Sequence, residues 1–197
     1  DVNVRERLIE LLVDRGQLDK AIEQYFQLAE AHYRQAELDQ ARQTYLAAHR
    51  LSKQSPDSRR WSLDILQKIA DIDLQQLDFR QAARVYEQIR SLQPDHADTR
   101  ARLIDLHFRL GQDTEALNEV NGYVSLLEST HKRSQAIEFL VAQVNAQPDK
   151  LELRRRLADL YRVDQQIDRA VEQLDAIADA LLNAGNTTGA RRTVEMI

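Results

Sequence analysis

The 197-residue sequence contains no cysteine, only five glycines and three prolines, and no apolar run long enough to cross a bilayer. Without cysteine the chain has no disulfide, no thiolate nucleophile and no cysteine-ligated metal. So little glycine and proline beside abundant Ala, Leu, Gln, Glu, Arg and Asp is typical of helices. We therefore predict an all-α protein.

The chain also lacks an excess of positive charge, since 32 acidic residues oppose 27 basic ones for a net charge of −5. This balance disfavours a nucleic acid or an anionic membrane as the main partner. No signal peptide opens the sequence, so we expect a cytoplasmic protein, and the Arg-, Gln- and Ala-rich composition suggests a bacterial one. Because the first residue is not methionine and the last ones are apolar, we expect a fragment of a longer protein.

A recurring pair of residues organises the sequence: an alanine followed four residues later by a bulky apolar or aromatic side chain. The alanines are Ala21, Ala41, Ala82, Ala116, Ala136, Ala170 and Ala190, and their partners are Tyr25, Tyr45, Tyr86, Val120, Leu140, Leu174 and Val194. The alanines are spaced 20, 41, 34, 20, 34 and 20 residues apart. Such recurrence indicates a repeat architecture, in which each unit buries its apolar face against its neighbours.

Glycine and proline occur where the turns and boundaries of this repeat are expected. Gly16, Gly111 and Gly185 each stand five residues before a marker alanine, where a helix hairpin needs a left-handed residue that glycine adopts without steric cost. All three prolines are followed by aspartate, a combination that favours the first turn of a new helix, capped by the carboxylate. We expect the prolines to mark boundaries between sub-units.

Helical periodicity between these marks predicts eleven helices. Their expected ranges are 3–14, 18–35, 38–53, 56–75, 79–92, 96–109, 113–128, 132–146, 150–163, 167–183 and 187–197. The prolines group them into sub-units of about 1–55, 56–94, 95–147 and 148–197 within one domain, 1–197.

The arrangement of Gly111 and Ala116, and of Ala82, Tyr86 and Pro94 with the next alanine 34 residues on, resembles the tetratricopeptide repeat (TPR). The resemblance covers nearly the whole chain and implies a right-handed superhelical α-solenoid of antiparallel helices. It is degenerate, because the family's tryptophan near the start of the first helix is replaced by Arg5, Leu66, Arg100 and Arg154. The 20-residue spacings add single helices to the family's helix pairs.

The first expected helix of each sub-unit carries a second pattern, in which a basic residue is followed three residues later by an acidic one. The four pairs are Arg7 with Glu10, Lys68 with Asp71, Arg102 with Asp105, and Arg156 with Asp159. One interpretation is a row of solvated surface bridges. The other follows from the resemblance, which implies that this row lies near the concave surface where TPR proteins hold extended peptides. The same resemblance argues against capture of a C-terminal carboxylate, because acids stand where that clamp has asparagine.

We predict that partner contacts come from six charged residues in the expected helices 96–109 and 150–163: Arg102, Asp105, Arg109, Arg155, Asp159 and Arg162. Trp61 has two interpretations, packing against the previous unit or anchoring a partner. The apolar end around Val194 and Ile197 invites end-to-end stacking.

The five histidines show no metal-ligand spacing, and no phosphate loop or nucleophile motif occurs. We therefore predict no enzyme, no cofactor and no metal. The expected function is a noncatalytic scaffold that binds a protein or peptide on a helical-repeat surface. The alternative is self-association into a homo-oligomer, or a regulatory spacer within a multidomain protein. A weaker alternative, RNA binding by helical repeats, is disfavoured by the acidic balance.

Overall fold

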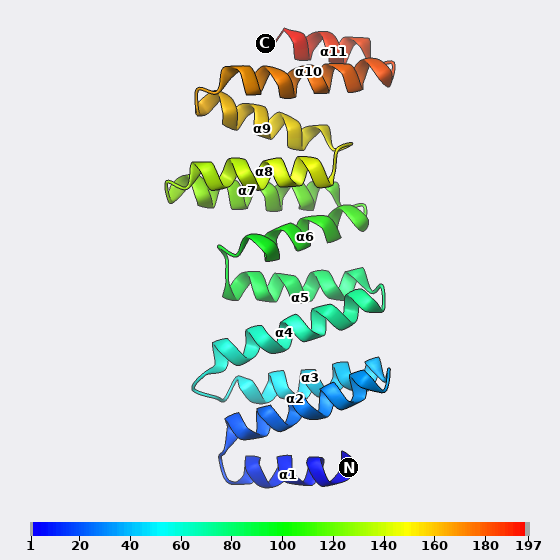
Figure 1. Cartoon of the computed structure of the whole chain (residues 1–197), viewed down its shortest axis with the longest axis vertical. Helices are drawn as coiled ribbons and strands as arrows, with labels where there is room; N and C mark the ends of the chain where they lie inside the picture. Colours follow the sequence, from blue (N-terminus) through cyan, green and yellow to red (C-terminus); the bar gives the residue numbers. More distant parts are fainter. Residues whose placement is uncertain (1, 196–197) are drawn as a thin grey trace. The chain divides into compact units, whose positions relative to one another are not determined.

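The computed structural model describes residues 2–195, and over that range the chain forms eleven α-helices and no strand (Figure 1). The helices are α1 (Val2–Asp14), α2 (Leu18–Arg34), α3 (Leu38–Ser52), α4 (Ser58–Gln75), α5 (Phe79–Leu92), α6 (Ala97–Arg109), α7 (Asp113–Ser129), α8 (Arg133–Ala146), α9 (Leu151–Val163), α10 (Ile167–Asn183) and α11 (Thr187–Val194). The first ten begin and end within two residues of the predicted ranges. The predicted end of the last helix, including Ile197, lies outside the described residues.

The chain divides into two compact units, Asp1–Gly111 with α1–α6 and Gln112–Ile197 with α7–α11. Within each unit, each helix packs on the next one along the chain and short turns reverse the direction (Figure 1). The predicted fold class, an all-α helical repeat of TPR type, is confirmed. The grouping of the whole chain into one domain with four proline-bounded sub-units stays a prediction.

The seven marker alanines are all buried, none more than 3% exposed, as the repeat pattern predicts. A methyl side chain at this position lets neighbouring helices approach closely. Five of the bulky partners, Tyr45, Tyr86, Val120, Leu140 and Leu174, are buried as well. Tyr25 is half-buried, and Val194 is 54% exposed.

The predicted left-handed glycines are confirmed, with φ of 69°, 70° and 76° at Gly16, Gly111 and Gly185. The helix ends close by backbone bonds typical of the Schellman motif; at the end of α1, Gln17 N donates to Leu12 O at 2.9 Å. The remaining turns before a marker alanine adopt the same conformation with side chains that lack glycine's freedom: Ala36, Leu77, His131 and Gln165, at φ of 59° to 61°. The turn geometry is therefore imposed by the hairpin even where the residue opposes it.

The proline loops differ from the prediction. Pro56, Pro94 and Pro148 lie before α4, α6 and α9, two or three residues outside the helices rather than in their first turns. The N-cap of α6 is His96, whose Nδ1 accepts a hydrogen bond from the Thr99 amide, and that of α9 is Lys150. Of the three aspartates that follow a proline, only Asp57 is an N-cap residue, and its side chain makes no capping hydrogen bond. The prediction was wrong because each proline and its aspartate occupy the two central positions of a turn that precedes the helix. The turns are closed by Ser58 N to Ser55 O at 3.2 Å, His96 N to Gln93 O at 3.3 Å and Lys150 N to Gln147 O at 3.1 Å.

Candidate partner-binding surface

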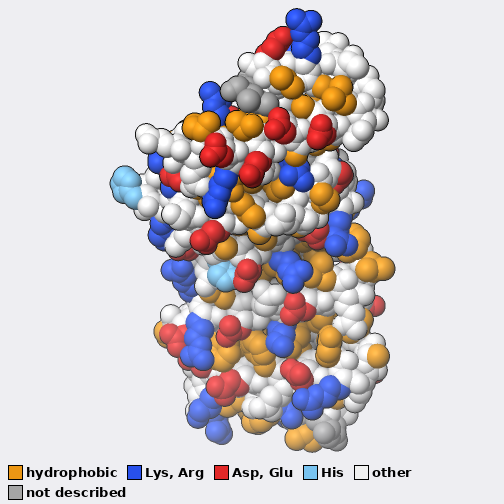
Figure 2. Space-filling model, turned by 45° about the horizontal axis from the view of Figure 1, so that its top comes forward, with side chains coloured by type: hydrophobic (Ala, Val, Ile, Leu, Met, Phe, Trp, Pro, Cys, Tyr) orange, Lys and Arg blue, Asp and Glu red, His pale blue; other side chains and the backbone are white. Residues whose placement is uncertain are grey.

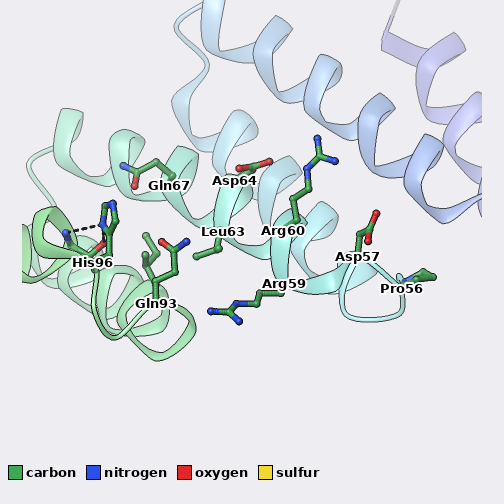
Figure 3. A pocket seen from close by; sticks show the side chains of 11 residues that line it. Pro56, Asp57, Arg59, Arg60, Leu63, Asp64, Gln67, Gln93 and His96 are labelled. Atoms are coloured by element: carbon green, nitrogen blue, oxygen red, sulfur yellow. Dashed lines mark hydrogen bonds between the residues drawn. The ribbon is translucent and has the colours of Figure 1, made fainter. Parts of the chain in front are cut away.

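An open groove of about 630 Å³ lies in the first unit, and we call it the α4–α6 groove. It is lined by α4, the end of α5 and the start of α6 (Figure 3). The lining residues are Pro56, Asp57, Arg59, Arg60, Leu63, Asp64, Gln67, Ile89, Gln93, His96 and Thr99. The groove therefore combines apolar side chains with both signs of charge, and its charged residues come from α4 and the loop before it.

Helix α4 supplies most of the groove. Figure 3 shows Arg60 and Asp64 projecting to one side of α4, whereas Arg59 extends toward the end of α5. There Arg59 Nη2 donates to the Leu92 carbonyl at 2.6 Å, which fixes one guanidinium edge. The Arg60 guanidinium lies 5.7 Å from the Trp61 ring centroid. Both arginines are exposed, so they keep donors for a bound group.

The groove adjoins the predicted charged row through Gln67. Its Nε2 donates to Asp71 Oδ1 at 3.1 Å and lies 3.5 Å from the Tyr86 hydroxyl. Burial raises the pKa of Tyr86, while Asp71 on α4 and Arg102 on α6 act on the same hydroxyl with opposite sign. Both charges therefore act on a hydroxyl that also lies within hydrogen-bond distance of Gln67, which lines the groove.

The three predicted site residues of the first unit lie on α6. Arg102 is exposed, and Arg109 Nε forms an ion pair with Asp105 Oδ2 at 2.7 Å. The Arg109 guanidinium also lies 5.6 Å from the Phe79 ring centroid. These side chains carry both signs of charge on the same helix as Thr99, which lines the groove.

The other three predicted residues lie on α9 in the second unit. Arg155 and Asp159 line a small crevice of about 160 Å³ between α7 and α9, and Arg162 is exposed near the end of α9. Arg155 Nε lies 3.7 Å from Glu152 Oε2, within the same crevice. These residues form a second candidate surface, within the second unit.

The predicted base–acid row is only partly a row of pairs. Arg7 does contact Glu10, at 2.5 Å. Arg156, by contrast, reaches from α9 to Glu128 on α7 at 3.2 Å rather than to Asp159. Its role is therefore to join two helices of the second unit. On the face shown in Figure 2, acidic and basic side chains are interspersed rather than gathered by sign.

Trp61 packs against an earlier helix, as the first of its two interpretations predicts. Its Nε1 donates to Asp19 Oδ1 at 2.8 Å, and its ring lies 5.8 Å from that of Phe26 on α2. Hydrogen bonds from Ser55 and from Trp61 hold the pKa of Asp19 below its usual value. The indole is half-buried and belongs to the core between α2 and α4.

The groove residues were not predicted from the sequence, although one signal for them was available. Arg59, Arg60 and Trp61 lie in the seven extra residues that lengthen the spacing from Ala41 to Ala82. Part of that excess forms the loop before α4, and the rest extends α4 beyond the other first helices. The groove opens beside this extension.

Across residues 2–195 no three His, Asp or Glu side chains are grouped so that they could hold a metal ion. None of the helices described is both long and apolar enough to cross a membrane.

These features define the class of the protein, a helical-repeat protein of the TPR type. The model of the soluble NSF attachment protein (SNAP) family matches residues 2–114, more than half of the chain. The chain therefore belongs to the SNAP family. No curated protein matches the sequence.

Several solved structures are similar in fold at low identity. BtubC from P. vanneervenii is 13% identical, with 99% of this chain and 87% of that chain covered and a TM-score of 0.45. MamA (41-end) from Desulfovibrio magneticus RS-1 is 14% identical, with 82% and 96% covered and a TM-score of 0.43. A tetratricopeptide repeat protein from Parabacteroides merdae is 15% identical, with 99% and 91% covered and a TM-score of 0.40.

Proposed function

We propose that this chain is a noncatalytic, cytoplasmic scaffold of bacterial origin that attaches another protein by holding one of its segments in the α4–α6 groove. The observation that carries the proposal is the composition of this groove, in which apolar side chains line the same space as side chains of both charge signs. Because its walls are helices, the groove is preformed and little of the scaffold has to become ordered on binding. The name of the SNAP family describes attachment of one protein, NSF, and we propose attachment as the general role here.

The groove chemistry indicates what the bound segment contains. Leu63 and Ile89 offer apolar contact for one anchoring side chain. Arg59 and Arg60 suit an acidic side chain or a carbonyl, and Asp57 and Asp64 suit a basic one. The fitting ligand is therefore an extended or helical segment of mixed charge with an apolar anchor, held without a clamp for a terminal carboxylate.

The six residues predicted from the sequence belong to this proposal as flanking contacts. Arg102, Asp105 and Arg109 would extend the bound surface along α6, beside the groove. Arg155, Asp159 and Arg162 would form a separate contact surface in the second unit. No cofactor, metal, nucleic acid or membrane takes part in the proposed function.

Affinity capture from a host lysate tests the proposal. The bait carrying Arg60→Glu and Arg102→Glu is compared with a matched bait carrying Arg80→Glu and Arg84→Glu, two exposed arginines on the other side of α5. We expect a captured protein that the wild type and the Arg80/Arg84 variant retain and the Arg60/Arg102 variant loses. Equal capture by all three baits would contradict a role for the groove.

A second candidate function is self-association, which exposed apolar side chains on α1 and α11 favour independently of the groove.

A further inference from the structure

Helices α2 and α3 recur as α4 and α5, 41 residues further along the chain. Small buried residues, left-handed turn residues and buried tyrosines all match at this offset. The matched pairs are Ala21 and Ser62, Ala29 and Ala70, Ala36 and Leu77, Ala41 and Ala82, and Tyr45 and Tyr86. The face of α4 that lines the α4–α6 groove therefore has a counterpart on α2.

Three groove residues of α4 stand at the positions of three residues of α2. The pairs are Arg60 with Asp19, Leu63 with Ile22, and Gln67 with Phe26. On α2 the central residue is fully buried and the outer two are half-buried. On α4 the central residue is half-buried and the outer two are exposed (Figure 3). The same face is therefore covered on α2 and open on α4.

An aromatic side chain contacts both ends of this face on α2. The ring centroid of Trp61, on α4, lies 5.8 Å from that of Phe26. At the other end of the face, Trp61 Nε1 donates to Asp19 Oδ1 at 2.8 Å. One side chain thus combines ring packing with a hydrogen bond from its polar edge. The chain itself shows which kind of side chain fits this face.

The open face on α4 differs from its counterpart in charge. Where α2 has the acceptor Asp19, α4 has Arg60, and Arg59 precedes it. A guanidinium has no acceptor for an indole N–H, but it attracts the face of an aromatic ring and pairs with a carboxylate. Arg60 already lies 5.7 Å from one ring centroid, that of Trp61. A phenyl or phenol ring beside a carboxylate therefore fits this face better than an indole.

The face recurs once more on α7, 54 residues after α4. At this offset the bounds of α5 and α6 coincide with those of α8 and α9. Leu117 and Asn121, the counterparts of Leu63 and Gln67, line the crevice of about 160 Å³ together with Arg155 from α9. The α4–α6 groove, at about 630 Å³, leaves more room for a side chain from another protein.

We propose that the partner segment anchors in the α4–α6 groove by a Phe or Tyr side chain, with an acidic residue beside it that pairs with Arg59 and Arg60. This inference rests on the proposed function and names the anchor of the bound segment. The groove's own acids, Asp57 and Asp64, disfavour a carboxylate elsewhere along it, because like charges that face each other across an interface repel.

Selection from a displayed library of short random peptides tests the anchor, with the full chain as the target. Peptides selected on the wild type should share a Phe or Tyr next to an Asp or Glu. Replacing that aromatic residue by alanine should weaken binding about tenfold or more. Selected peptides that bind without an aromatic residue, or a library that yields no binder, would overturn the inference.

The double variant Arg60→Asp/Gln67→Phe gives the groove the residue types of Asp19 and Phe26. Both replaced side chains are exposed, and matched melting curves verify that the fold is kept. Selection on this variant should turn from Phe or Tyr with an acidic neighbour to Trp, because the indole N–H gains an acceptor. The control is Arg84→Asp, at an exposed residue of α5 outside the groove, which should select the wild-type peptides. A selection that does not turn to Trp overturns the inference.

Partner capture separates this inference from the function on which it rests. A captured protein that is lost with the Arg60/Arg102 variant, but whose contacting segment has no aromatic residue, would uphold the proposed function and overturn the anchor. If no protein is captured, both are overturned.

Discussion

Arg42 on α3 binds Asp73 on α4 side-on, with Nε 2.5 Å from Oδ1 and Nη2 3.2 Å from Oδ2. The Asp73 side chain is 1% exposed and that of Arg42 is 23% exposed. The hydrogen bond to Asp73 raises the pKa of Arg42, so the guanidinium is charged throughout the accessible pH range. The pair joins two helices that also make a polar contact, between the Ser52 and Ser62 hydroxyls at 3.4 Å.

The unequal burial of the two partners predicts unequal costs of removing them. Arg42→Met leaves a buried carboxylate without its cation and should lower the free energy of unfolding by about 3 kcal/mol. Asp73→Asn leaves an arginine that reaches water and should cost about 1–2 kcal/mol. Urea unfolding followed by the fluorescence of Trp61, the chain's one tryptophan, reports on the unit that holds the pair.

The control for this pair is Arg34→Met, because Arg34 is 76% exposed and lies 3.8 Å from Glu30. Its cost should stay below about 0.5 kcal/mol. Equal losses for Arg42→Met and Asp73→Asn would show that burial of the carboxylate does not set the cost.

The left-handed turn at Leu77 predicts a stabilising substitution. Leu77 has φ of 59° and a side chain that is 71% exposed, so glycine would relieve strain with little loss of packing. Leu77→Gly should raise the free energy of unfolding by about 0.5–1 kcal/mol. Leu77→Ala is the matched control, since it keeps the Cβ atom and should leave stability nearly unchanged. If the glycine variant is no more stable than the alanine variant, the backbone at Leu77 is not strained.

His49 predicts a pH dependence of stability. Burial lowers the pKa of His49, and the positive charge of Lys53 adds to the effect. The unfolded chain therefore binds a proton more readily than the folded one below about pH 6.5. Stability from this residue is complete above that pH and is lost as the pH falls through the lowered pKa. His49→Gln should flatten the fall in unfolding free energy on acidification.

The control for His49 is His131→Asn, at an exposed turn position where asparagine tolerates positive φ. It should leave the pH profile like that of wild type. If His49→Gln keeps the wild-type slope, the protonation of another group causes the loss.

The packing of Trp61 against Phe26 predicts its fluorescence. A half-buried indole that donates to Asp19 should emit at shorter wavelength than in the urea-unfolded chain and be quenched less by acrylamide. Trp61→Phe should melt earlier because the Asp19 hydrogen bond is lost. Quenching as strong as in the unfolded chain would instead indicate an exposed indole, which is the partner-anchor interpretation.

Helix positions could be predicted from the sequence because they depend on residues that are close together along the chain. The alanine pairs, the apolar period and the glycine turns all act within a few residues, so the helix ranges came within two residues for ten helices. The four left-handed turns without glycine were not predictable from residue type. Their recurrence five residues before a marker alanine was the available signal, because hairpin closure overrides the preference of residues such as Leu77.

The contents of the candidate surface depend on tertiary packing and were therefore harder to predict. The α4–α6 groove brings the region from Pro56 to Gln67 together with His96 and Thr99. These two residues come, on average, more than thirty positions later in the sequence than that region. The partner of Arg156 likewise comes from α7 rather than from the next helical turn. A helical spacing identifies neighbours on one helix only.

Photo-crosslinking from the α4–α6 groove shows whether a partner protein binds there. A photoreactive residue replaces Gln67 in the groove, and a matched one replaces Arg84, exposed on α5 outside it. Both baits are irradiated in host lysate. The proposed function predicts a discrete crosslinked protein from position 67 that is absent from position 84 and disappears when Arg60→Glu is added. Equal crosslinking from both positions, or none from position 67 while the wild-type bait still captures a partner, would contradict it.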